Sequence, residues 1–152
     1  MLSPFNDFSL FHFKAEELAN FYFGFNGWNS EILYHQLEEQ QQNEHTYATA
    51  VRLSFKKEKD QKVEGVGLSK AKFKNATEKS SQLAMAQKNS KYAAMLNAFS
   101  KVIIVLVHTD NKMKVTSRID YTKNDPFYYN SLWDNKPIIE VQELEDEPEL
   151  EI

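Results

Sequence analysis

Hydrophobic and polar residues alternate most regularly between residues 46 and 55. Five of these residues fall on one face of an extended chain: Tyr47, Thr49, Val51, Leu53 and Phe55. A period of two is typical of a half-buried β-strand. Residues 63–73 predict another strand after a charged hairpin turn at 56–61, and a weaker alternation at 30–37 predicts an earlier one. The polar stretch 38–44 is expected to be a loop, so the pattern predicts an antiparallel sheet of three or more strands.

Helical periodicity predicts a short helix at 14–23 and a long one at 77–99. The long helix carries an apolar stripe made of Met85, Tyr92, Leu96 and Phe99. Asn75 or Thr77 is expected to cap its first turn, because a short polar side chain can accept a hydrogen bond from a free backbone N–H there. A sheet packed on a long helix is an α+β fold.

Two glycines in a predicted strand and the residues after the long helix give further structural predictions. Gly65 and Gly67 lie inside a predicted strand, which indicates either a bulge or a close approach of another backbone. The β-branched run 102–107 and the alternating residues 113–119 predict a hairpin, although 102–107 could instead continue the long helix. An irregular segment packed by aromatic residues is expected beyond Tyr121.

Length and composition favour one domain. A chain of 152 residues is long enough for one sizeable core, and we place that domain at 14–137. Residues 1–13 are expected to form an extended aromatic arm, and 138–152 an acidic, disordered tail. The absence of cysteine excludes disulfides and thiol chemistry. No apolar run approaches the length of a membrane span, so no membrane partner is expected.

The charges are segregated along the chain. The net charge is −4, yet residues 138–152 carry seven acidic residues and no basic one. Residues 52–114 hold 14 basic and five acidic residues. A local basic excess of this kind is typical of a surface that contacts a phosphate backbone. The acidic tail is interpreted either as a solubilising end or as an internal competitor for that basic surface.

The candidate nucleic-acid-binding residues are the cations of the predicted strands and long helix. Arg52 is the strongest single candidate, because a guanidinium binds phosphate through two hydrogen bonds and also stacks on bases. Lys70, Lys72 and Lys74 are two residues apart and would share one strand face. The complete set is Arg52, Lys56, Lys57, Lys70, Lys72, Lys74, Lys79, Lys88 and Lys91.

Aromatic residues near the first helix are a further possibility. Four of them could stack on bases: Phe21, Phe23, Phe25 and Trp28. Aromatic residues at this density, however, more often belong to a core or an interface.

Catalysis is not expected. The four histidines lack metal-ligand spacing, and Glu58, Asp60 and Glu64 around Lys62 suit a turn better than a nuclease site. We therefore expect no metal and no cofactor.

Two blocks, at 15–28 (AEELANFYFGFNGW) and 81–106, resemble the Rad-fifty-two-motif-containing protein family, a relative of the single-strand annealing recombination proteins. Glu64-Gly65-Val66-Gly67 lies where that family has a glycine-containing strand. Because the sequence starts almost at the motif, we expect no function of the RNA-recognition module that can precede the motif in that family. The resemblance implies a sheet packed on a helix, as in a double-stranded-RNA-binding domain, together with single-stranded DNA binding and ring-like homo-oligomers.

The functional hypothesis is a non-enzymatic DNA-binding protein of DNA repair or homologous recombination. It would prefer single-stranded DNA, with strand annealing as a candidate activity, and would act in the nucleus or also in the cytoplasm. The alternatives are a protein-interaction module of a repair complex and an RNA-binding protein that uses the same face. Sequence alone does not separate DNA from RNA, because nothing in it shows a reader for the 2′-hydroxyl.

Overall fold

The fold consists of two helices and two sheets. The structure is a computed structural model, and it describes residues 8–56, 61–129 and 139–145. The elements are α1 (Phe8–Phe23), β1 (Trp28–Gln41), β2 (Glu44–Phe55), β3 (Gln61–Lys72), α2 (Ala76–Phe99), β4 (Val102–Thr109), β5 (Lys112–Ile119), β6 (Phe127–Tyr128) and β7 (Glu140–Glu145). Sheet A has the strand order β1-β2-β3-β6, and sheet B the order β5-β4-β7. The predicted α+β class, with a sheet packed on a long helix, is confirmed.

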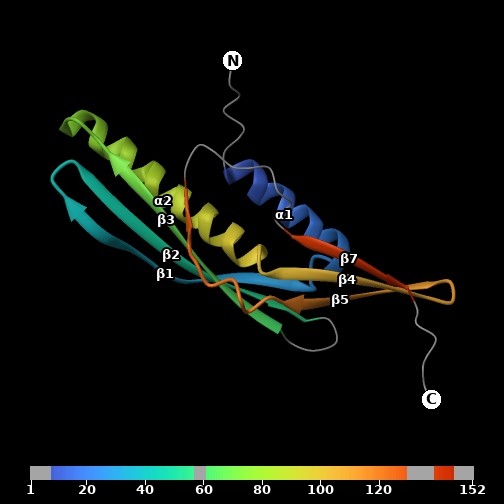
Figure 1. The fold of residues 1–152 in the computed structure, drawn as a ribbon. Coiled ribbons are helices and arrows are strands. Elements are labelled where there is room, and N and C mark those ends of the chain that lie inside the picture. Colours follow the sequence, from blue (N-terminus) through green and yellow to red (C-terminus); the bar gives the residue numbers. More distant parts are fainter. Residues whose placement is uncertain (1–7, 57–60, 130–138, 146–152) are drawn as a thin grey trace.

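The helices cover one face of sheet A and leave the other face open (Figure 1). Helix α2 packs across β2 and β3, and α1 packs beside α2. The hairpin of β4 and β5, joined by β7, extends beyond one end of sheet A. Side chains from both sheets and both helices meet in one hydrophobic core, which includes Phe55, Phe99 and Ile104.

The first hairpin is longer than the sequence pattern predicts. Residues 38–41 belong to β1 rather than to a loop, and only residues 42 and 43 form the turn. Their polar side chains are compatible with a strand because β1 is an edge strand, and this part of it is exposed. The pairing of β1 with β2 is irregular at two places, between Ile32 and Tyr34 and between Leu37 and Glu39. These irregularities interrupt the alternation of hydrophobic and polar residues along β1.

The two glycines of β3 let α2 approach the sheet closely. A Cβ atom built on Gly67 would lie 2.1 Å from the backbone nitrogen of Ala94, and one on Gly65 would lie 2.3 Å from that of Ala98. The expected close approach is therefore confirmed. Asn75 caps α2, since its Oδ1 accepts a hydrogen bond from the Glu78 N–H at 3.0 Å.

Both ends of the chain differ from expectation. Helix α1 begins at Phe8, so the arm predicted over 1–13 is helical from that residue onward, and residues 1–7 lie outside the described part. In the segment expected to be disordered, residues 140–145 form β7, which pairs in parallel with β4. Strand β4 is largely buried, and its second edge gains a hydrogen-bonding partner in this way.

The chain after α2 forms strands. Residues 102–107 belong to β4 and pair with β5, so the hairpin interpretation is confirmed over the helical one. The aromatic segment beyond Tyr121 includes the short strand β6, which pairs in parallel with β3 through Gly67 and Leu68. This pairing closes part of the outer edge of β3.

Candidate nucleic-acid interface

Four lysines gather where β3 ends and α2 begins, and we call this group the basic end: Lys70, Lys72, Lys74 and Lys79. Strand alternation places Lys70 and Lys72 on the open face of sheet A. Because β3 ends at Lys72, Lys74 lies in the connection to α2 and does not share that strand face as predicted. Lys79 follows in the first turns of α2. The turn between β1 and β2 lies beside them, since the Phe73 N–H donates to the Asn43 carbonyl at 3.2 Å.

The charge of the basic end is only partly compensated. Lys70 Nζ lies 3.5 Å from Glu44 Oε2, and Lys79 Nζ lies 5.7 Å from the centre of the Phe73 ring. Glu78 accepts a hydrogen bond from the Lys74 N–H at 2.9 Å and thereby completes the cap of α2. Within the described residues, the ammonium groups of Lys72, Lys74 and Lys79 form no ion pair. Three exposed cations therefore remain available to an anionic partner.

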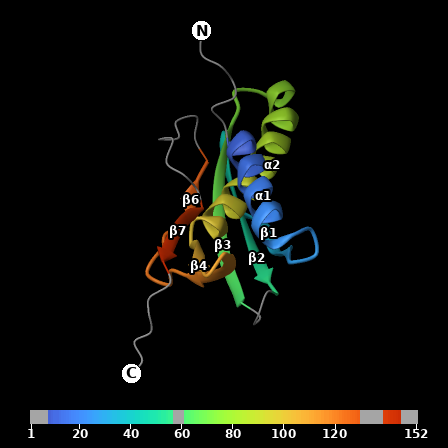
Figure 2. The same cartoon turned by 90° about the vertical axis from the view of Figure 1, so that its right-hand side faces the viewer.

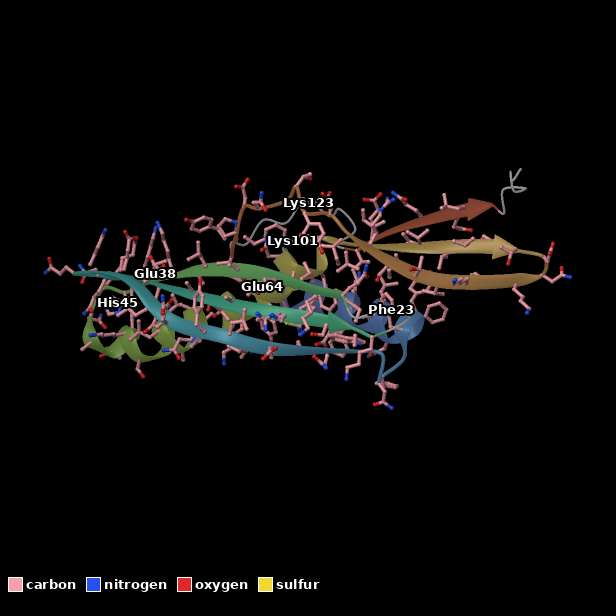
Figure 3. The ribbon with its side chains drawn as sticks, turned by 90° about the horizontal axis from the view of Figure 1, so that it is seen from below. Phe23, Glu38, His45, Glu64, Lys101 and Lys123 are labelled. Atoms are coloured by element: carbon pink, nitrogen blue, oxygen red, sulfur yellow. The ribbon has the colours of Figure 1, made fainter. Side chains whose placement is uncertain are left out.

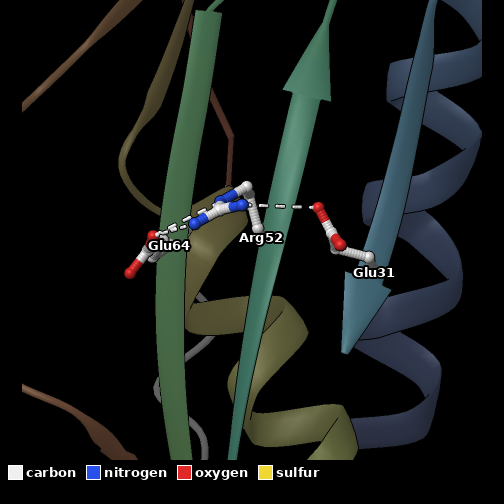
Figure 4. Close-up of polar contacts among 3 residues, drawn as sticks. All are labelled: Glu31, Arg52 and Glu64. Carbon is white, nitrogen blue, oxygen red and sulfur yellow. Dashed lines mark hydrogen bonds and ion pairs between the residues drawn. The ribbon is translucent and has the colours of Figure 1, made fainter. Parts of the chain in front are cut away.

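Arg52 is differently placed from the lysines. On the open face, its guanidinium lies 3.5 Å from Glu31 Oε1 on β1 and 3.0 Å from Glu64 Oε2 on β3 (Figure 4). These contacts, led by the hydrogen bond to Glu64, raise the pKa of Arg52. A phosphate would have to displace two carboxylates from it. Its role in phosphate binding stays a prediction, but its geometry suits a link between three strands better.

The other candidate cations lie on separate surfaces. Lys56 follows β2 at the far end of sheet A from the basic end, and Lys57 lies outside the described residues. Lys88 Nζ lies 5.8 Å from the centre of the Tyr92 ring on α2. Lys91 lines a cavity of about 440 Å³ between α1, α2 and β1. The described candidates thus do not form one continuous patch.

The four aromatic residues considered for stacking separate into two kinds. Phe23 is buried, and Trp28 packs against the core and donates a hydrogen bond from Nε1 to Asn20 Oδ1 at 2.8 Å. Phe21 and Phe25 are 77% and 82% exposed. The structural interpretation therefore holds for two of the four, and the other two lie at the surface near the end of α1.

Sequence reasoning missed a second group of cations. One cavity is lined by Lys62, Lys101 and Lys123, although they come from β3, the turn after α2 and the loop after β5. No local sequence signal connects residues so far apart along the chain. Only the packing of α2 against β3 brings them together.

Other chemistry is not evident in the described residues. No group of three His, Asp or Glu side chains there is arranged to hold a metal ion. Of the acidic residues considered for a nuclease, Glu64 is paired with Arg52, while Glu58 and Asp60 lie outside the described part. No described helix is both long enough and apolar enough to cross a membrane.

Over residues 10–103 the chain matches the family model of the RDM1 DSRM domain. The chain belongs to that family. The match runs from α1 to the start of β4 and so contains the basic end. It supports the fold resembling a double-stranded-RNA-binding domain, and it overturns the expected family: the matching model is the RDM1 DSRM domain, not a Rad52-motif family. The comparison with curated proteins gives no match. A DSRM domain indicates nucleic-acid binding, in particular of RNA, or protein interaction.

Proposed function

We propose that this protein binds double-stranded RNA through the basic end and catalyses no reaction. The observation that supports the proposal is the set of three lysines between the end of β3 and the first turns of α2 that form no ion pair within the described residues, on a DSRM scaffold. Domains of this class recognise an RNA duplex by its shape and by contacts to phosphates and 2′-hydroxyls. Lysine ammonium groups, as mobile point charges, suit phosphates spaced along such a backbone.

The environment of the basic end favours a duplex over a single strand. Single-strand binding sites combine cations with flat aromatic side chains on which bases stack. The aromatic ring at this end, Phe73, is buried and lies beneath Lys79. Preference for single-stranded DNA, a role in repair or recombination, and nuclear location stay predictions with less support than RNA binding.

The test compares binding of duplex RNA, duplex DNA and the two corresponding single strands at several salt concentrations. The triple variant Lys72→Gln, Lys74→Gln, Lys79→Gln should weaken duplex RNA binding for all sequences alike. It should also reduce the slope of log affinity against log salt by about three, roughly one for each lysine that contacts phosphate.

Arg52→Gln is a control that removes a single positive charge outside the basic end. Because Glu31 and Glu64 already hold the Arg52 guanidinium, this variant should change duplex affinity by less than about twofold, as expected for an exposed, paired charge. If the triple variant binds like the parent while Arg52→Gln loses affinity, the phosphate site lies around Arg52 rather than at the basic end, and the proposal is wrong.

A protein partner is the second candidate, because Phe21 and Phe25 remain largely exposed at the end of α1. Exposed aromatic rings of this size commonly mark contact surfaces. If the protein binds none of the four nucleic acids at low salt, this candidate is favoured. Self-association that is lost in the Phe21→Ser, Phe25→Ser variant, measured by sedimentation, would identify the contact.

A further inference from the structure

A cavity of about 310 Å³ lies at the outer edge of β3, away from the basic end. Lys62 of β3, Lys101 after α2 and Lys123 of the following loop line it, together with Glu64, Tyr121 and Asn124. Lys101, Lys123 and Glu64 can be followed in Figure 3, where the two lysines lie close together. We call this site the three-lysine pocket. Its volume is at the small end of the range for ligand sites, about 300–1,000 Å³.

Backbone carbonyls, rather than ion pairs, hold two of the ammonium groups of the three-lysine pocket. Lys101 Nζ donates to the Glu64 backbone carbonyl at 2.7 Å, and Lys123 Nζ donates to the Ser100 carbonyl at 3.0 Å. Each ammonium has three N–H donors, so one neutral acceptor positions it without neutralising it. In the described part of the chain, none of the three lysines forms an ion pair.

Two carboxylates near the pocket, those of Glu64 and Asp120, are already engaged. Glu64 accepts two hydrogen bonds from Arg52, at 3.0 Å from Nη2 and 3.3 Å from Nε, and Asp120 Oδ1 accepts two from Thr122. Burial lowers the pKa of Lys101, and the charge of Glu64 only partly opposes this effect. A bound anion would stabilise the charged form of this partly buried ammonium, as the charge of Glu64 does in part.

The loop that forms one wall of the pocket is held in place at three points. The Asp120 N–H donates to the Lys101 carbonyl at 2.8 Å, and Asn97 Nδ2 donates to the Asp125 carbonyl at 2.9 Å. The third point is the bond from Lys123 to Ser100. This anchored loop presents Tyr121, whose side chain is 74% exposed and lies beside the lysines. An exposed aromatic ring on an anchored loop, next to cations, is the combination that binds a base and its phosphate.

We propose that the three-lysine pocket binds one nucleotide, with its phosphate against Lys62, Lys101 and Lys123 and its base stacked on Tyr121. The phosphate could belong to a single nucleic-acid strand or to a free nucleotide. This site differs from the duplex-binding basic end in position, in its residues and in its use of an aromatic platform. It therefore does not depend on the proposed function.

The test uses the full chain and records amide chemical shifts during titration with uridine 5′-monophosphate and, separately, with a short oligouridine. Shifts are expected at residues 62, 101 and 121–124. Tyr121→Ala should weaken binding by about fivefold or more, the low end of the loss expected when a stacking platform is removed. Lys62→Gln combined with Lys123→Gln should weaken it similarly, and Lys101 is left intact because it anchors β3.

The controls separate this site from the basic end. Lys112→Gln removes one cation from the distant β4–β5 turn and should leave nucleotide binding unchanged, as should Lys72→Gln with Lys74→Gln. Shifts with both probes support a site for free nucleotides, and shifts with oligouridine alone support a strand site. If Tyr121→Ala and the double lysine variant bind both probes like the parent, or if the shifts fall outside the pocket, the proposal is overturned.

Discussion

At the scale of single residues, small side chains decide how closely the main helix and sheet can approach. Gly65 and Gly67 face Ala94 and Ala98 of α2, and the nearest atoms to a new Cβ would be backbone atoms. Backbone atoms cannot rotate away as the tip of a flexible side chain can. The position of α2, and with it the start of the basic end, depends on these glycines.

Gly67→Ala is expected to lower the free energy of unfolding by about 3 kcal/mol, because the helix must move to accept the methyl group. Gly24→Ala is the matched control. Gly24 has a φ of 83° but no atom within 4 Å of a new Cβ, so only backbone strain of about 1 kcal/mol is expected. Urea unfolding of both variants measures the difference. Equal losses would show that the close approach is not what limits position 67.

At the scale of elements, a chain of polar contacts joins the first hairpin to α2. His35 Nδ1 lies 2.7 Å from Thr49 Oγ1, which lies 2.7 Å from the buried Ser90 Oγ. Ser90 Oγ in turn donates to the Gln87 carbonyl at 2.9 Å. Helix α1 adds a second histidine, His12, whose ring lies 5.1 Å from that of Tyr92. Both histidines therefore take part in side-chain contacts between different secondary-structure elements.

This packing makes stability sensitive to acid. Burial, reinforced by the charge of Lys91, lowers the pKa of His35, and burial lowers the pKa of His12 despite the opposing charge of Glu16. The unfolded chain, with histidine pKa values of about 6.5, then binds more protons than the folded chain. Their contribution to stability is complete above that pH and is lost as the pH falls through the lower folded-state values.

The measurement is the free energy of unfolding at pH values from neutral down to mildly acidic. His35→Asn should make the decrease shallower, because one of the two histidines no longer takes up a proton on unfolding. A parent protein whose stability is constant or rises as the pH falls below about 6.5 would contradict this explanation.

At the scale of the whole molecule, opposite charges are placed at opposite ends. The basic end lies at the start of α2, whereas the acidic strand β7 pairs with β4 at the other end (Figures 1 and 2). Glu143 of β7 lies 3.0 Å from His108 of β4. Strand β7 is thus a structural part of sheet B, and it does not cover the basic end.

Replacing Glu140 and Glu143 by glutamine should raise affinity for duplex RNA by less than about twofold at 0.1 M salt, because charges more than about 10 Å apart are largely screened. Deleting the chain from residue 139 is a different experiment. It removes the buried Ile139 and exposes an edge of β4, so loss of soluble protein is expected. A large gain in affinity from the glutamine variant would instead indicate competition between β7 and the basic end.

Sequence patterns predicted most elements, because alternation and helical periodicity are local properties. The strand around Val51, the cap at Asn75 and the close approach at Gly67 could all be predicted in this way. The polar end of β1 could not, since only pairing with β2 makes that stretch a strand. The strand nature of residues 140–145 was missed for the same reason: acidic composition indicates disorder unless a buried neighbour such as β4 needs a partner.

The fold class and the local excess of basic residues follow from the order of residues along the chain. Which of those cations remain available depends on how the strands and helices pack. Arg52 loses its apparent advantage because β1 and β3 each place a carboxylate beside it, whereas Lys72 and Lys74 lie where no carboxylate of the described residues pairs with them. Lys62, Lys101 and Lys123 form a site only once α2 packs on β3. Electrostatic partners depend on distance in space, and a sequence specifies distance only along the chain.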